Sequence, residues 1–208
     1  TTGLYNLYMN GGTVECSGDL SCLHDEMNGG TTVLKLTGTT PRTYTWSAGA
    51  FPHLEVAYGV GGEMASSGST ALEAQGLTMT SGDFTAPTGE FLLSKGSTYG
   101  HTFMTVTYGT FTHNSGTVKL VQTTSDWNGS RTATWTVNSA IAFNNLTIAS
   151  GNSYSHRTTY LSLTGSVNPT VAGLLKIDTT GLYNLIMNGG TFECSGDVSC
   201  VHGEMNGG

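Results

Sequence analysis

The chain has 208 residues, only 10% of them charged, and fourteen acidic against seven basic residues leave a net charge of −7. The lysines and arginines are scattered singly, which argues against a nucleic-acid partner because such partners require clustered basic residues. No apolar run approaches the roughly eighteen residues of a membrane-spanning helix, so no membrane span is expected in this stretch.

Small uncharged residues dominate the composition. Glycine accounts for 30 residues, and threonine, serine and asparagine are plentiful. Ordinary globular proteins carry charge on roughly a quarter of their residues. This mixture of low charge and small polar side chains is typical of secreted bacterial surface proteins, so we expect an extracellular or cell-surface location. We expect no cofactor.

The first thirty residues of the chain return at its end. Residues 179–208 match residues 1–30 at all but five positions, at a constant offset in residue number (179 − 1 = 178). One difference is Asp25/Gly203, and the other four exchange apolar residues: Tyr8/Ile186, Val14/Phe192, Leu20/Val198 and Leu23/Val201. This pattern indicates tandem copies that diverged under a packing constraint. We interpret 1–178 as one full repeat period and 179–208 as the start of the next.

Between the copies, the dominant local pattern is a short alternation of apolar and polar residues. Such alternation predicts half-buried strands, and it recurs at 34–36, 54–56, 77–79, 118–120, 146–148, 161–163 and 175–177. Glycines follow several of these segments within a few residues and predict turns. No helical periodicity is sustained. Residues 69–76 are the best helical candidate, but they are too few and too close to glycines for a stable helix.

We therefore predict an all-β fold, specifically a β-solenoid (parallel β-helix) of short stacked coils of roughly 20–25 residues each. Tandem immunoglobulin-like β-sandwiches are the alternative, disfavoured by the short strands and the frequent turns. A weaker inner repeat places Trp46 and Trp135 in similar sequence segments. Their residue numbers differ by 135 − 46 = 89, which is half of the offset between the copies. Each period therefore divides into two diverged halves of about 89 residues.

Two phrases carry a family resemblance. Residues 108–118 (YGTFTHNSGTV) and 142–148 (AFNNLTI) resemble the strand repeats of very long bacterial surface proteins, which are similar to parallel β-helix adhesins. The resemblance implies export, a stacked β fold, and a role as adhesin, filament or sheath. It implies no enzymatic residues.

Four cysteines form one recurring pair. Because Ser-Gly-Asp within each pair suits a turn, we predict local disulfides Cys16–Cys22 and Cys194–Cys200. A metal site is the alternative, with ligands drawn from Cys16, Cys22, His24, Asp19, Asp25 and Glu26. The cysteine spacing is wrong for zinc and the second copy lacks Asp25, so we expect no metal.

Few other residues indicate chemistry. Asp83, Asp126 and Asp178 are far apart in sequence and Asp25–Glu26 is the single acidic doublet, so we expect no catalytic residues and no enzyme. Trp46 and Trp135 are predicted to pack in the stack at matching places.

Two turn residues are candidates for an exposed site. Trp127 lies in a turn and is the candidate for a ligand contact. Asn128 matches a glycosylation pattern, as does Asn145, but Asn145 opens a predicted buried strand and is not expected to be usable.

These observations predict a structural extracellular protein, a tandem-repeat β-solenoid that forms a surface filament, fibre or sheath. Its expected partners are copies of itself, joined end to end or as covalent repeats, with surface polysaccharide as a second candidate. We expect another copy of the segment after Gly30 to follow Gly208. A carbohydrate-binding adhesin stalk is the first alternative, and a polysaccharide-degrading β-helix enzyme is the less favoured one.

Overall fold

The fold is a parallel β-solenoid. The computed structural model describes residues 7–25, 27–28, 30–96, 101–123, 133–137, 140–150, 158–163, 168–178, 184–188, 190–201 and 205–207. Within these ranges the regular structure is entirely β-strand, and the registered strand pairs are parallel. This confirms the all-β solenoid and excludes immunoglobulin-like sandwiches, whose sheets are antiparallel.

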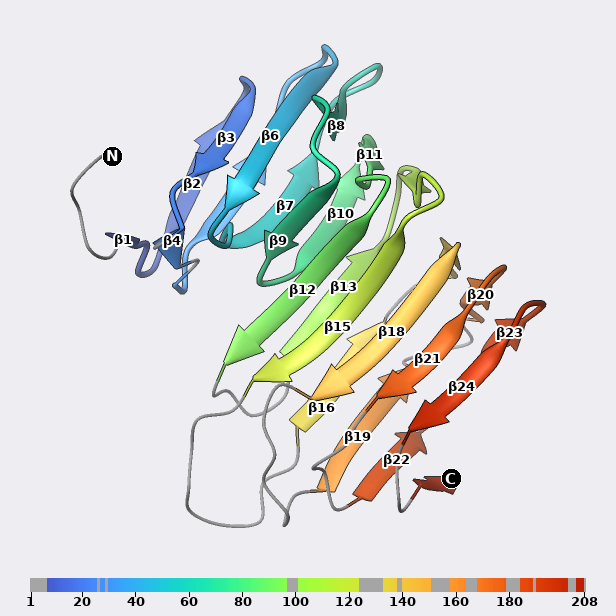
Figure 1. Cartoon of the computed structure of the whole chain (residues 1–208). Helices are drawn as coiled ribbons and strands as arrows, with labels where there is room; N and C mark the ends of the chain where they lie inside the picture. The colour runs from blue at the N-terminus through green and yellow to red at the C-terminus, as the bar shows by residue number, and fades with distance from the viewer. Residues whose placement is uncertain are drawn as a thin grey trace. The chain divides into compact units, whose positions relative to one another are not determined.

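The chain divides into two compact units. Residues 1–93 with 106–116 form the first unit, and residues 94–105 with 117–208 form the second. In each unit, successive strands of one coil belong to different sheets, and each strand pairs with strands of neighbouring coils. Figure 1 shows the resulting rows of arrows, with the arrows of a row running in one direction.

The first unit has three main sheets. Their orders are β2-β5-β7-β10, β3-β6-β8-β11-β14 and β9-β12, and β1 pairs with β4. The strands are β1 (Leu7–Tyr8), β2 (Thr13–Cys16), β3 (Leu20–Leu23), β4 (Met27–Asn28), β5 (Val33–Leu36), β6 (Arg42–Ala48), β7 (His53–Ala57), β8 (Glu63–Ser66), β9 (Ala71–Ala74), β10 (Leu77–Ser81), β11 (Asp83–Thr85), β12 (Glu90–Gly96) and β14 (Phe111–Thr112).

The strand register measures the coil length of this unit. Thr13 pairs with Val33, and Val33 pairs with His53, so the residue number advances by 20 in each of these coils (33 − 13 and 53 − 33). Leu54 pairs with Leu77, so the next coil is slightly longer (77 − 54 = 23). These lengths agree with the predicted coil size, but Phe84 pairs with Phe111, and that coil (111 − 84 = 27) is longer than predicted.

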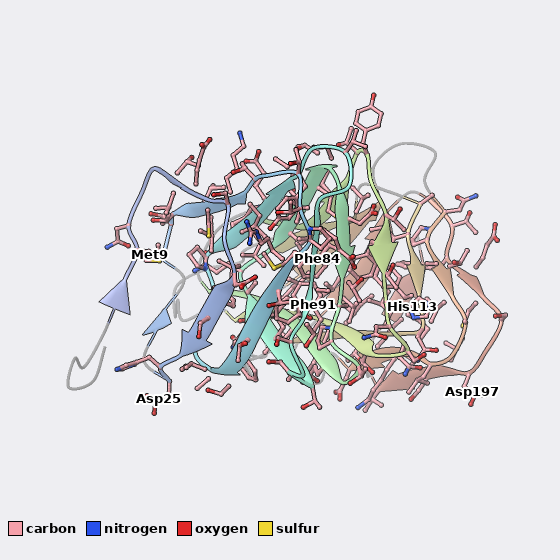
Figure 2. All side chains as sticks on the ribbon, turned by 90° about the horizontal axis from the view of Figure 1, so that it is seen from above. Met9, Asp25, Phe84, Phe91, His113 and Asp197 are labelled. Carbon is pink, nitrogen blue, oxygen red and sulfur yellow. The ribbon has the colours of Figure 1, made fainter. Side chains whose placement is uncertain are left out.

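The core of the first unit consists of apolar side chains stacked from coil to coil. Leu34, Leu54 and Leu77 are paired in register and buried. A second ladder is aromatic: Phe84 is fully buried, and its ring stacks on Tyr44 at 5.9 Å and on Phe111 at 6.3 Å between centroids. Figure 2 shows Phe84 within the ribbon, with Phe91 close to it.

The second unit follows the same plan. Its sheets run β13-β16-β19-β22-β25, β15-β18-β21-β24 and β17-β20-β23. The strands are β13 (His101–Val106), β15 (Thr117–Thr123), β16 (Ala133–Val137), β17 (Ala142–Phe143), β18 (Asn145–Ser150), β19 (Thr158–Leu163), β20 (Thr170–Val171), β21 (Leu175–Asp178), β22 (Asn184–Asn188), β23 (Glu193–Cys194), β24 (Val198–Val201) and β25 (Met205–Gly207).

Apolar ladders also fill the second unit. Leu120, Ile148 and Ile177 are paired in register and buried, as are Phe143 and Val171. Its coil length varies: Ala133 pairs with Thr159, so the residue number advances by 159 − 133 = 26, whereas Leu185 pairs with Met205 and the advance is 205 − 185 = 20.

The seven predicted alternating segments all lie within strands. Residues 69–76, the helical candidate, instead contain β9, in which Leu72 and Ala74 face the core. A short alternation next to a paired strand is stabilised by that pairing, and this outweighs the helix propensity of Ala-Leu-Glu-Ala.

The predicted burial of Trp46 is only partly correct. Trp46 is half-buried on β6, and its indole Nε1 donates to the Gly49 carbonyl at 2.8 Å. Trp46 pairs with Cys22 of β3, whereas Trp135 lies on β16 and pairs with His101 of β13 and Leu161 of β19. The two tryptophans belong to different sheets, so the predicted matching places are wrong.

The aromatic ladder should contribute strongly to stability. We predict that Phe84→Ala lowers the free energy of unfolding by about 3–5 kcal/mol, because it removes a fully buried ring from between two others. Equilibrium urea unfolding measures this. Tyr108→Ala is the matched control, because that ring is 71% exposed and its loss should change stability by less than about 0.5 kcal/mol. Equal losses in the two variants would contradict the stacked core.

Candidate functional site

The repeated segment is the first candidate site, because its two copies share one strand pair in the same register. In the first copy, Leu7 of β1 pairs with Met27 of β4. In the second copy, Leu185 of β22 pairs with Met205 of β25. Both residues of the second pair follow those of the first by the same offset (185 − 7 = 178 and 205 − 27 = 178). The sequence repeat is therefore also a repeat of strand register.

The two copies are paired with neighbours on opposite sides. In the first copy, β2 and β3 pair with the strands that follow in the chain, β5 and β6. In the second copy, β23 and β24 pair with strands that precede them, β20 and β21. Together the copies show how the same coil is joined to the coil before it and to the coil after it.

The predicted disulfides are wrong for this structure, which contains none among the four described cysteines. Cys16 ends β2 and pairs with Leu36, whereas Cys22 lies on β3 and pairs with Trp46 of a different sheet. The chain turns a corner between two sheets here instead of doubling back, and a disulfide requires the two Cα atoms to approach within about 7 Å. The Cys22 side chain is 1% exposed and its Sγ donates to the Ala48 carbonyl at 3.0 Å.

The second pair of cysteines follows the same pattern. Cys194 pairs with Val171, and Cys200 pairs with Ile177, and both of these partners are buried. The cysteines therefore occupy core-facing positions of two ladders, where a thiol serves as a small apolar side chain.

The acidic residues and the histidine that were candidate metal ligands are placed as follows. Asp19 Oδ1 accepts a hydrogen bond from the Thr43 amide at 2.9 Å, which ties the corner before β3 to β6. His24 Nδ1 lies 3.7 Å from Asp25 Oδ1, and that carboxylate is 86% exposed. Glu26 lies outside the described residues. Within the described ranges, no group of three or more His, Cys, Asp or Glu side chains could hold a metal ion.

The candidate ligand and glycosylation residues Trp127 and Asn128 lie outside the described residues, as does Asp126. Asn145 is described and opens β18, as predicted. Its Oδ1 accepts from the Leu174 amide at 2.7 Å, and its Nδ2 lies 3.4 Å from Thr117 Oγ1. Because both ends of its amide are bonded within the stack, Asn145 is an inter-coil connector.

The other two aspartates considered for catalysis are also engaged. Asp83 Oδ1 accepts from the Thr110 amide at 2.9 Å. Asp178 Oδ2 lies 2.7 Å from Lys176 Nζ, since residues two apart on a strand share a face. Asp83 is paired in register with Glu63 of β8, whose Oε1 accepts a hydrogen bond from Thr85 Oγ1 at 2.9 Å.

A charge ladder on the outer face of the first unit was missed by the sequence analysis. Lys35 Nζ lies 3.8 Å from a carboxylate oxygen of Glu15 and 3.8 Å from one of Glu55. These residues are paired in register on β2, β5 and β7. Their equal spacing in the sequence matches the coil length and is the signal that could have identified the ladder. Ion pairs between partly exposed side chains such as these are worth about 1 kcal/mol each, so this ladder aligns coils more than it stabilises them.

A polar corner lies beneath the turns of the first unit. Tyr58 is 1% exposed and packs under glycines: a Cβ added at Gly82 would lie 2.5 Å from Tyr58 Cβ, and one at Gly62 would lie 2.6 Å from it. The Tyr58 hydroxyl and Arg42 Nε are both buried with no hydrogen-bond partner among the described residues. Burial raises the pKa of Tyr58 to about 12, which the thiol of Cys16 reinforces and Arg42 opposes.

Comparison of the chain with protein-family models, with curated proteins and with solved structures finds no match. No helix long and apolar enough to cross a membrane occurs in the described part of the chain. The features of the chain that bear on its function are therefore the sequence repeat, the strand register and the composition.

Tyr44 and Tyr58, both buried in the first unit, should respond oppositely to loss of the hydroxyl. Tyr58→Phe removes a hydroxyl that has no hydrogen-bond partner among the described residues, and it should raise the free energy of unfolding by up to about 1 kcal/mol. Tyr44→Phe, the matched control, removes a bond from Tyr44 Oη to the Thr85 carbonyl at 3.2 Å and should lower it by about 1 kcal/mol. Urea unfolding at pH 7 measures both, and a loss in Tyr58→Phe would contradict the unpaired hydroxyl.

The Tyr58 hydroxyl should also make stability depend on pH in alkali. Its pKa is raised from 10.0 to about 12, so between these values the unfolded chain loses the proton while the folded chain keeps it. The contribution of this hydroxyl to the free energy of unfolding is then complete below pH 10 and is lost as the pH rises towards 12. In Tyr58→Phe the fall in this window should be smaller than in the parent chain. Identical pH profiles would contradict the shift.

The thiols should be chemically detectable. We predict that the chain, unfolded without reductant, reacts with four equivalents of a thiol reagent, because none of the four cysteines is in a disulfide. In the native state Cys22 should react most slowly, since burial raises the pKa of this thiol and hides it from solvent. A count of zero in the unfolded chain would restore the disulfides.

Proposed function

We propose that this is a structural, non-catalytic protein, a β-solenoid built from tandem copies of the period 1–178 that serves as an extended filament or fibre at a cell surface. One observation carries the proposal: the repeated segment keeps its strand register, with Leu7–Met27 in one copy and Leu185–Met205 in the other. A segment that returns in sequence and in pairing lets one period continue into the next without a change of fold.

The residue chemistry supports a structural role. The described aspartates at positions 19, 83 and 178 hold corners or pair with lysine. Each such bond joins one coil to the next or fixes a strand face, which is what a stacked fibre requires. The cell-surface location is supported by the low charge and by the resemblance to long bacterial surface proteins.

The test is a chain in which residues 31–208 follow Gly208 directly, so that one further period is added. If the periods stack coil on coil, the particle should lengthen by about seven coils of roughly 4.8 Å, or about 34 Å, without becoming thicker. Negative-stain electron microscopy and small-angle X-ray scattering measure this. The control joins residues 1–208 to an unrelated globular domain of similar mass. A particle that grows in all directions would refute the fibre.

A further inference from the structure

The strand β24 presents core-facing side chains to solvent. Val198 pairs with Leu175 and Cys200 pairs with Ile177, and the two partners are 5% and 4% exposed. Paired residues of parallel strands point to the same face, so Val198 and Cys200 point toward the interior. Yet Val198 is 63% exposed and Cys200 is also exposed. The far edge of β24 ends its sheet in the described part of the chain.

The first copy shows what covers this edge. There β3, the equivalent of β24, pairs with β6, and Leu20 lies opposite Tyr44. The Cys22 side chain falls to 1% exposure and its Sγ lies 3.0 Å from the Ala48 carbonyl. The same interface includes the bond from the Thr43 amide to Asp19.

The second copy retains the groups that make these contacts. Cys200 and Asp197 are the repeat equivalents of Cys22 and Asp19, and Val198 replaces Leu20 with another apolar side chain. Asp197 is exposed, and Figure 2 shows it at the outer edge of the ribbon. The two carboxylates are therefore equivalent, one bonded to its neighbouring coil and the other open to solvent.

We propose that the face formed by Asp197, Val198 and Cys200 is a docking surface for a strand with the sequence and register of β6. The occupant is the copy of residues 42–48 in the next period of the same polypeptide. In a separate 1–208 molecule β3 already occupies the matching edge of β6, so a separate molecule is a poor donor. This inference rests on the proposed function and names the contacts by which one period joins the next.

The position of each contact follows from the first copy. Val198 lies opposite the copy of Tyr44, and Cys200 opposite the copy of Trp46. The thiol of Cys200 then meets the carbonyl of the copy of Ala48, and Asp197 accepts from the amide of the copy of Thr43. Docking therefore buries Cys200, and its reactivity reports on the interface directly.

The experiment compares the alkylation rate of Cys200 in the 1–208 chain and in the chain extended by residues 31–208. All other cysteines are replaced by alanine, including the added copies of Cys194 and Cys200. We expect Cys200 to react at least about tenfold more slowly in the extended chain. A matched pair of chains that keeps Cys22 alone should react slowly in both lengths. Fast reaction of Cys200 in both lengths, with Cys22 protected, overturns the docking surface.

A register control tests the contact made by the carboxylate. Asp197→Asn keeps the size of the side chain but weakens the acceptor, and it should partly restore the reactivity of Cys200 in the extended chain while leaving the 1–208 chain unchanged. No effect in either chain overturns the assigned contact. Protection of Cys200 that rises with the concentration of 1–208 alone would show a separate molecule as occupant and overturn the covalent assignment.

Particle length separates this inference from the proposed function. An extended chain that lengthens as a fibre while Cys200 stays reactive refutes the docking register alone. An extended chain that neither lengthens nor protects Cys200 refutes both. Protection of Cys200 in a chain that does lengthen supports both.

Discussion

The parallel hydrogen-bond ladder between successive coils is the constraint on which the rest of the structure depends. Parallel pairing without offset places each residue directly against its partner in the next coil, so apolar residues meet apolar residues, as in Leu34, Leu54 and Leu77. The same rule aligns Glu15, Lys35 and Glu55 on the outer face. A charge inside the stack would be buried against apolar neighbours at a high cost, so the charged residues of this ladder lie on the outer face.

The corners obey a second constraint, the close approach of stacked turns. Gly82 adopts a φ of +78°, and a side chain there would collide with Tyr58. Glycine thus serves both the left-handed backbone and the packing of the ring beneath it. The cost appears nearby, where the Tyr58 hydroxyl and Arg42 Nε are buried without hydrogen-bond partners among the described residues. The close packing of the turns therefore leaves these two polar atoms beneath them without room for a hydrogen-bond partner in the described part of the chain.

Alternation predicted the fold well because it reports directly on which face of a strand is buried, as at Leu175 and Ile177 of β21. It could not predict which sheet a strand joins, because that depends on the accumulated length of the coils. Trp46 and Trp135 lie in similar sequence segments but on different sheets for this reason, since the length of a coil varies along the chain, from 33 − 13 = 20 residues to 159 − 133 = 26. The cysteine pair failed similarly: its spacing fits a loop, but the chain turns a corner within it.

The role of some residues in the repeated coil becomes clear only when the two copies are compared. Asp19 and Cys22 resemble fragments of a ligand set when viewed alone. Set against β6, they are an acceptor and a small core residue that complete a joint. Their equivalents Asp197 and Cys200 have the same identities while exposed, although exposed positions are ordinarily free to diverge. Four of the five substitutions between the copies exchange one apolar residue for another. A constraint of this kind is what packing against a neighbouring coil would impose on both copies.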